Sequence, residues 1–92
     1  MRITAEVSLY PLQDQFLPRI ETFIRTIDAA PGLGVIVNQM STQSRGELKD
    51  VTKAVEQALA SSFQAGGPQV LVAKFLNANP LIGEAPDLDP PG

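Results

Sequence analysis

The 92-residue chain contains neither cysteine nor histidine. Without cysteine it cannot form a disulfide, and without either residue it lacks the ligands of an ordinary structural zinc site. The same absences remove the commonest general base near neutral pH and the thiolate nucleophile of covalent catalysis. No glycine-rich phosphate loop occurs either, because Gly32-Leu33-Gly34 and Gly66-Gly67 are typical of helix stops. We therefore expect a protein that is not an enzyme and that carries no metal or other cofactor.

The chain is also short. A chain of this length buries only about 60–65% of the surface that its unfolded form exposes, so its core contributes little excess stability. Small domains that have neither disulfides nor metals often gain stability by associating with further copies. We expect a single domain that forms a homo-oligomer.

Positive charge is not in excess. Residues 1–76 contain seven acidic and seven basic side chains, and residues 77–92 add three acidic ones. Nucleic-acid binding usually needs a basic stripe, and no basic amphipathic helix indicates a membrane surface. No apolar run approaches the length of a membrane span, and the N-terminus lacks the continuous apolar stretch of a signal peptide. We expect a cytoplasmic protein with no nucleic-acid or membrane partner.

The first dozen residues alternate in the manner of a β-strand with two different faces. The apolar face carries Ile3, Ala5, Val7 and Leu9. The polar face carries Thr4, Glu6, Ser8 and Tyr10. Because this strand begins at residue 2, we expect it to be the first element of the domain, and Pro11 closes it.

The rest of the chain alternates helical and strand patterns. Apolar residues at three- and four-residue spacing predict a helix that follows either Asp14 or Leu17 and ends at Ala30-Pro31-Gly32. They predict a second helix from about residue 48 to Gly66-Gly67-Pro68. Further strands are predicted at residues 34–38, 42–47 and 70–76, with a turn at residues 38–41.

The resulting order, β-α-β-β-α-β, predicts an α+β ferredoxin-like plait over residues 1–77. In this fold a four-stranded antiparallel sheet carries both helices on one face. The strands near residues 2–11 and 42–47 would be central. Residues 78–92 hold four prolines and three acidic residues, which is typical of a flexible tail.

The face of the sheet away from the helices would be uncovered. If the apolar face of the first strand meets the helices, Phe75 belongs to the core and Lys74 pairs with Glu6 on the open face. Val70, Val72 and Leu76 would then be exposed on that face. Three exposed aliphatic side chains favour an interface, so we expect a second copy to cover it.

A cluster of hydrogen-bonding side chains lies on the first strand and around the predicted turn. The turn residues Asn38, Ser41 and Thr42 can simply bond their own backbone. Glu6 and Lys74 can be an ordinary cross-strand ion pair, and Met40 a filler of a core or an interface. The same groups can also hold a small molecule that presents both donors and acceptors.

Three stretches together resemble the YkoF-like thiamine-binding family of small ferredoxin-like proteins. They are residues 3–12, residues 38–43 with Gly46-Glu47 behind them, and Lys74-Phe75-Leu76-Asn77. The resemblance covers residues 1–77 and says nothing about the acidic tail.

The resemblance implies a homotetramer, built as a dimer of dimers whose sheets pack together. It also implies binding of thiamine or its hydroxymethylpyrimidine part without turnover, for carriage, buffering or sensing. Unphosphorylated forms are favoured, since Lys74 and Arg45 are the only basic groups nearby. The expected ligand contacts are Glu6, Ser8, Tyr10, Asn38, Met40, Ser41, Thr42 and Gln43. The alternative is an oligomeric structural or regulatory module that binds no small ligand.

Overall fold

The computed structural model describes residues 1–14 and 16–78. Its elements are β1 (Arg2–Pro11), α1 (Leu17–Asp28), β2 (Gly34–Val37), β3 (Thr42–Glu47), α2 (Leu48–Gln64) and β4 (Gln69–Leu76). The predicted element order is confirmed. The tail predicted to be flexible lies outside the described residues except for Ala78.

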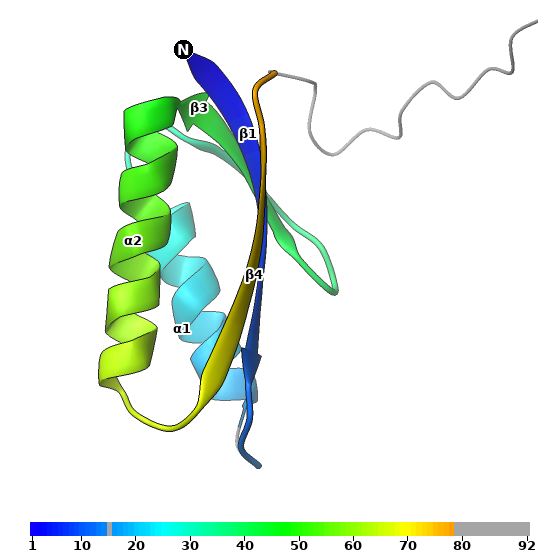
Figure 1. Cartoon of the computed structure of the whole chain (residues 1–92), viewed down its shortest axis with the longest axis vertical. Coiled ribbons are helices and arrows are strands. Elements are labelled where there is room, and N and C mark those ends of the chain that lie inside the picture. The colour runs from blue at the N-terminus through cyan, green and yellow to red at the C-terminus, as the bar shows by residue number, and fades with distance from the viewer. Residues whose placement is uncertain (15, 79–92) are drawn as a thin grey trace, which may run out of the picture.

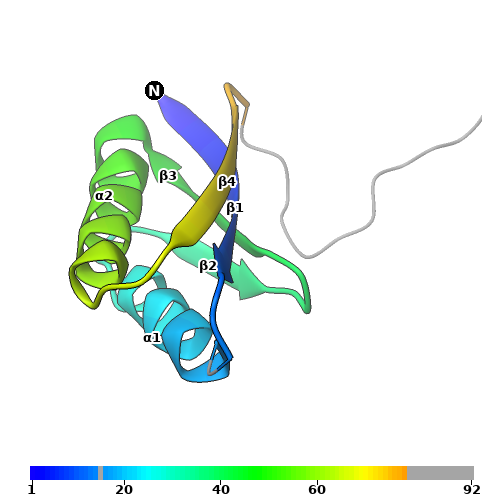
Figure 2. The same ribbon diagram turned by 60° about the horizontal axis from the view of Figure 1, so that its bottom comes forward.

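The four strands form one sheet in the order β2-β3-β1-β4, and every neighbouring pair is antiparallel. Both helices lie on the same face of this sheet, as the two views in Figures 1 and 2 show. The predicted ferredoxin-like fold is therefore confirmed, with β1 and β3 central and β2 and β4 at the edges. Within the described residues, neither helix is long and apolar enough to cross a membrane.

The core lies between the sheet and the helices. The apolar face of β1 supplies it, because Ile3, Ala5, Val7 and Leu9 are all buried. Phe23 and Ile27 of α1 pack with Val7 and Leu9. Val51 of α2 packs with Ile3 and Ala5 nearer the start of the chain. The alternation of β1 thus fixes which face of the sheet meets the helices, and it leaves the polar side chains on the open face.

The sequence explains where α1 begins and ends. Pro18 lies in the first turn of α1, where its missing N–H removes no intrahelical hydrogen bond. After α1 the chain turns at Gly32, whose φ of 82° favours glycine.

The apolar stripe of α2 is buried only at its centre, since Leu48 and Phe63 at its two ends are exposed.

The expectation that Phe75 joins the core is wrong. Phe75 lies opposite Ala5 and so on the helix side of the sheet, yet it is 52% exposed. The reason is that β4 is an edge strand, whereas α2 packs over β1 and β3. On the open face the expectation is confirmed: Lys74 Nζ lies 3.7 Å from Glu6 Oε1, and Val70, Val72 and Leu76 are exposed.

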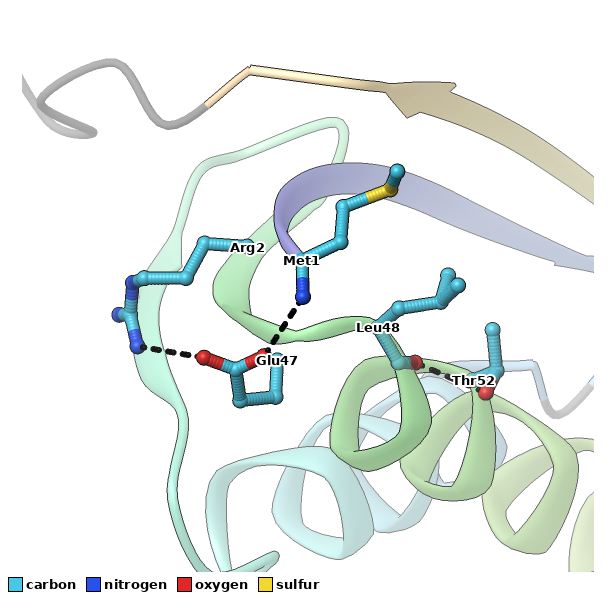
Figure 3. Close-up of polar contacts among 5 residues, drawn as sticks. All are labelled: Met1, Arg2, Glu47, Leu48 and Thr52. Atoms are coloured by element: carbon cyan, nitrogen blue, oxygen red, sulfur yellow. Dashed lines mark hydrogen bonds and ion pairs between the residues drawn. The ribbon is translucent and has the colours of Figure 1, made fainter.

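The N-terminus is fastened to the junction of β3 and α2 (Figure 3). The Met1 ammonium group donates to Glu47 Oε2 at 3.1 Å, and Arg2 Nη1 lies 3.8 Å from Glu47 Oε1. The Leu48 amide donates to the Met1 carbonyl oxygen at 2.9 Å. These contacts hold the first residue of β1 against the first turn of α2.

Candidate functional site

The site forms where β1 extends beyond its partner β3. β1 pairs with β4 as far as Pro11, whereas its pairing with β3 ends at Val7 opposite Thr42. Between β2 and β3 the chain makes a tight turn, in which the Asn38 amide donates to the Ser41 carbonyl oxygen at 2.8 Å. The turn at residues 38–41 therefore lies beside the last residues of β1.

A cavity of about 420 Å³ occupies this place, bounded by the end of β1, the first half of α1 and the β2–β3 turn. Its volume lies within the range of about 300–1,000 Å³ that is typical of small-molecule sites. The apolar wall is made by α1 and by the segment that precedes it, with Phe16, Ile20, Phe23 and Ile24. The polar wall is made by the turn, with Asn38, Gln39, Ser41 and Thr42.

Two side chains of β1 hold the turn in place. The Ser8 hydroxyl donates to the Met40 carbonyl oxygen at 2.8 Å, and the Ser41 hydroxyl donates to Glu6 Oε2 at 3.2 Å. Gln43 of β3 donates from its side-chain nitrogen to the same Glu6 oxygen at 3.1 Å. The turn is thus bonded to the strand that forms the floor of the cavity.

Six of the eight ligand contacts predicted from the sequence line this cavity. They are Ser8, Tyr10, Asn38, Met40, Ser41 and Thr42. The other two, Glu6 and Gln43, do not line it but lie beside it on the open face of the sheet, hydrogen-bonded to each other.

The sequence interpretation missed the wall formed by α1. Phe16, Ile20 and Ile24 belong to the apolar stripe that predicts this helix, and a stripe alone does not separate core positions from positions facing a cavity. The one signal available in the sequence was the position of Phe16, the first apolar residue of the stripe. In the structure Phe16 lies just before the helix, at its N-cap position, and is exposed.

Among the residues that the structure describes, none that lines the cavity carries a charge. On the neighbouring open face, the charged group bonded to the lining residue Ser41 is Glu6, which also faces Lys74 and Gln43. A phosphate group inside the cavity would therefore lack a cationic side chain among the described lining residues. The arrangement suits a flat, uncharged or weakly cationic ring with donors and acceptors at its edge.

A second cavity, of about 380 Å³, lies between the two helices. Three of its polar side chains bond backbone carbonyl oxygens. Arg19 donates to the carbonyl oxygens of Ser62, Ala65 and Gly66 at the end of α2, and Thr22 and Thr26 donate to carbonyl oxygens one turn back. Across residues 1–14 and 16–78, no group of three or more acidic residues gathers as a metal site would need.

No protein-family model matches the chain, and no curated protein matches it significantly. Several solved structures do resemble it. A hypothetical protein from Methanocaldococcus jannascii has 24% sequence identity and a TM-score of 0.74, over 85% of this chain and 81% of the other. The domain of unknown function DUF77 from Bacillus cereus has 20% identity and a TM-score of 0.71, over 89% and 84% of the two chains.

A third structure, of a candidate thiamine biosynthesis/salvage protein from Thermotoga maritima, has 18% identity and a TM-score of 0.66, over 85% of each chain. At these identities the similarity establishes the fold. The chain spans most of the length of each of these proteins, so the shared fold is that of the whole domain.

Proposed function

We propose that this protein is a YkoF-like, non-catalytic binder of thiamine or of its hydroxymethylpyrimidine part. The observation that carries the proposal is the cavity of about 420 Å³ at the end of β1, which six of the eight predicted contacts line. The fold similarity to the Thermotoga maritima protein supports the same class of ligand. We also propose that the protein is cytoplasmic and acts by carrying, buffering or sensing this ligand.

The cavity lining matches the chemistry of an aminopyrimidine. This ring presents an amino donor beside ring nitrogens that accept, and the side-chain amide of Asn38 and the hydroxyl of Thr42 can answer both. The Ser41 hydroxyl, whose hydrogen goes to Glu6, can accept from the amino group. Tyr10 and Phe16 offer aromatic faces to the flat ring, and the Met40 thioether adapts to its edge. For intact thiamine, the same aromatic faces attract the cationic thiazolium ring.

We further propose that the ligand is unphosphorylated. The described lining of the cavity, within residues 1–14 and 16–78, includes no charged residue, and Lys74 on the open face is paired with Glu6. Thiamine pyrophosphate would have to place its phosphates where no described lining residue is cationic, which costs affinity.

The open face of the sheet is the proposed interface between copies. Val70, Val72 and Leu76 line the exposed side of β4, and Tyr10 lies next to them on β1. Apolar side chains that gather in this way on an antiparallel sheet usually meet another protein surface. Two copies packed through these faces, and two such dimers together, give the tetramer that the family resemblance implies.

The same exposed face also favours the alternative, an oligomeric module that binds no small ligand. Isothermal titration calorimetry separates the two proposals, with thiamine, hydroxymethylpyrimidine and thiamine pyrophosphate titrated separately at two temperatures. We expect saturable binding of at least one unphosphorylated compound and weaker binding of the pyrophosphate. Tyr10→Ala should reduce the affinity, whereas the matched variant Thr26→Ala, in the cavity between the helices, should not. No binding heat at either temperature would leave the ligand-free module as the better proposal.

A further inference from the structure

Glu6 lies outside the wall of the cavity but holds a residue that forms it. Its Oε2 accepts the hydroxyl hydrogen of Ser41, which lines the cavity, and a side-chain hydrogen of Gln43, which does not. The Ser41 carbonyl oxygen in turn accepts the Asn38 amide hydrogen. The carboxylate of Glu6 therefore fixes the residue that closes the β2–β3 turn.

The second carboxylate oxygen of Glu6 faces the other way along the sheet. Oε1 lies 3.7 Å from Lys74 Nζ, and the Lys74 side chain is 77% exposed. An ion pair this exposed contributes little stability by itself and is easily exchanged for another partner. One carboxylate thus joins a solvent-accessible charge on β4 to the polar wall of the cavity.

We propose that Glu6 is a positioning residue for the cavity, which sets the shape of the turn at residues 38–41 according to its charge partners on the open face. This inference deepens the proposed function and rests on it for the identity of the ligand. It gives Glu6 a role different from that of a ligand contact. The open face, where a second copy would pack, is connected through Glu6 to the site where a ligand would bind.

Amide hydrogen exchange of the unliganded full-length chain tests the positioning role without any ligand. Removing the carboxylate in Glu6→Ala should raise the exchange rate of the Asn38 backbone amide by about 3- to 10-fold. The reason is that the turn opens locally once Ser41 has lost its hydrogen bond to Glu6. Glu6→Gln should raise it less, since the amide oxygen still accepts from Ser41 and Gln43. Lys74→Met, which changes only the charge partner, should also produce a measurable increase.

Glu47→Ala is the matched control. Glu47 is the carboxylate at the opposite end of the same face, where β3 ends away from the turn, and it bonds Met1 and Arg2. Its removal should leave the Asn38 exchange rate unchanged. Unchanged exchange in Glu6→Ala, or an equal increase in Glu47→Ala, would overturn the positioning role.

Calorimetry with hydroxymethylpyrimidine and thiamine then compares Glu6→Ala, Ser41→Ala and the double variant. If Glu6 acts through Ser41, adding Glu6→Ala to Ser41→Ala should change the dissociation constant by less than about 2-fold. Fully additive losses would instead make Glu6 a direct contact and overturn the inference. If neither compound binds the wild type, the proposed function fails, while the exchange experiment still decides whether Glu6 positions the turn.

Discussion

The hydroxyl of Ser8 donates a hydrogen bond of 2.8 Å to the carbonyl oxygen of Met40, although the two residues are 32 positions apart. This bond joins the floor of the cavity to the tip of the β2–β3 turn at the point where β1 no longer pairs with β3. The bond holds the turn against β1 at a place where a longer β3 would otherwise pair with β1. It also leaves space for a cavity between the strand and the turn.

Ser8→Ala should therefore loosen the turn. Net stabilisation by one hydrogen bond is about 0.5–1.5 kcal/mol, and the exposure of this bond favours the lower end of that range. Urea unfolding measures the loss in the free energy of unfolding. Thr52→Ala is the control, since Thr52 is exposed and donates within α2 to the Leu48 carbonyl oxygen. A larger loss in Thr52→Ala than in Ser8→Ala would contradict the prediction.

Gly46→Ala should destabilise the fold by about 1–3 kcal/mol, because a methyl group there overpacks the interior. A Cβ at this position would lie 2.9 Å from the carbonyl oxygen of Gly32 and 2.8 Å from Leu33 Cδ2. The backbone contact cannot be relieved by a side-chain rotation. We therefore expect no rescue when Leu33→Ala is added. Thermal unfolding gives the comparison, and a melting temperature equal to that of the wild type would show that the loop of residues 30–33 moves away freely.

The parts of the fold that were predictable from the sequence are those with strong local periodicity. The alternation of β1 predicts both its length and its buried face, and helical spacing predicts α1 and α2. β3 is almost wholly polar, yet Ser44 is buried opposite Ala5 of β1. Its position followed from the order of the other elements, since a strand was needed to complete the plait.

The parts that were not predictable depend on how far one element reaches over another. Alternation predicts the side of β4 on which Phe75 lies. The exposure of the Phe75 side chain depends instead on the position of α2 above β1 and β3. In the same way, the polar residues of the site could be selected by type. The cavity itself arises because β1 extends beyond β3, and no local pattern encodes the difference between two pairing lengths.

Arg19→Met should lower the free energy of unfolding by about 1–2 kcal/mol. Hydrogen bonds from a charged donor contribute about 1.5–3 kcal/mol, and the partial exposure of Arg19 reduces this. The Arg19 guanidinium joins α1 to the last carbonyl oxygens of α2, including that of Ala65 at 3.0 Å. Arg19→Lys should restore only part of the loss, because an ammonium group cannot present the same planar set of donors. Urea unfolding checks the order, with the exposed Lys53→Met as the control.

Val72→Lys should separate the subunits of the proposed oligomer without unfolding them. Val72 lies in the middle of β4, on the open face that we propose as the interface, and its side chain is exposed in the single chain. A lysine there would bring its ammonium group close to the facing copy and leave it without water or a counter-charge. Sedimentation velocity should show a smaller species with an unchanged circular dichroism spectrum. Gln57→Lys adds the same charge on the exposed side of α2 and should leave the assembly intact. Unchanged sedimentation of Val72→Lys would mean that copies associate through another surface or that the protein is a monomer, and the wild-type sedimentation coefficient distinguishes these two cases.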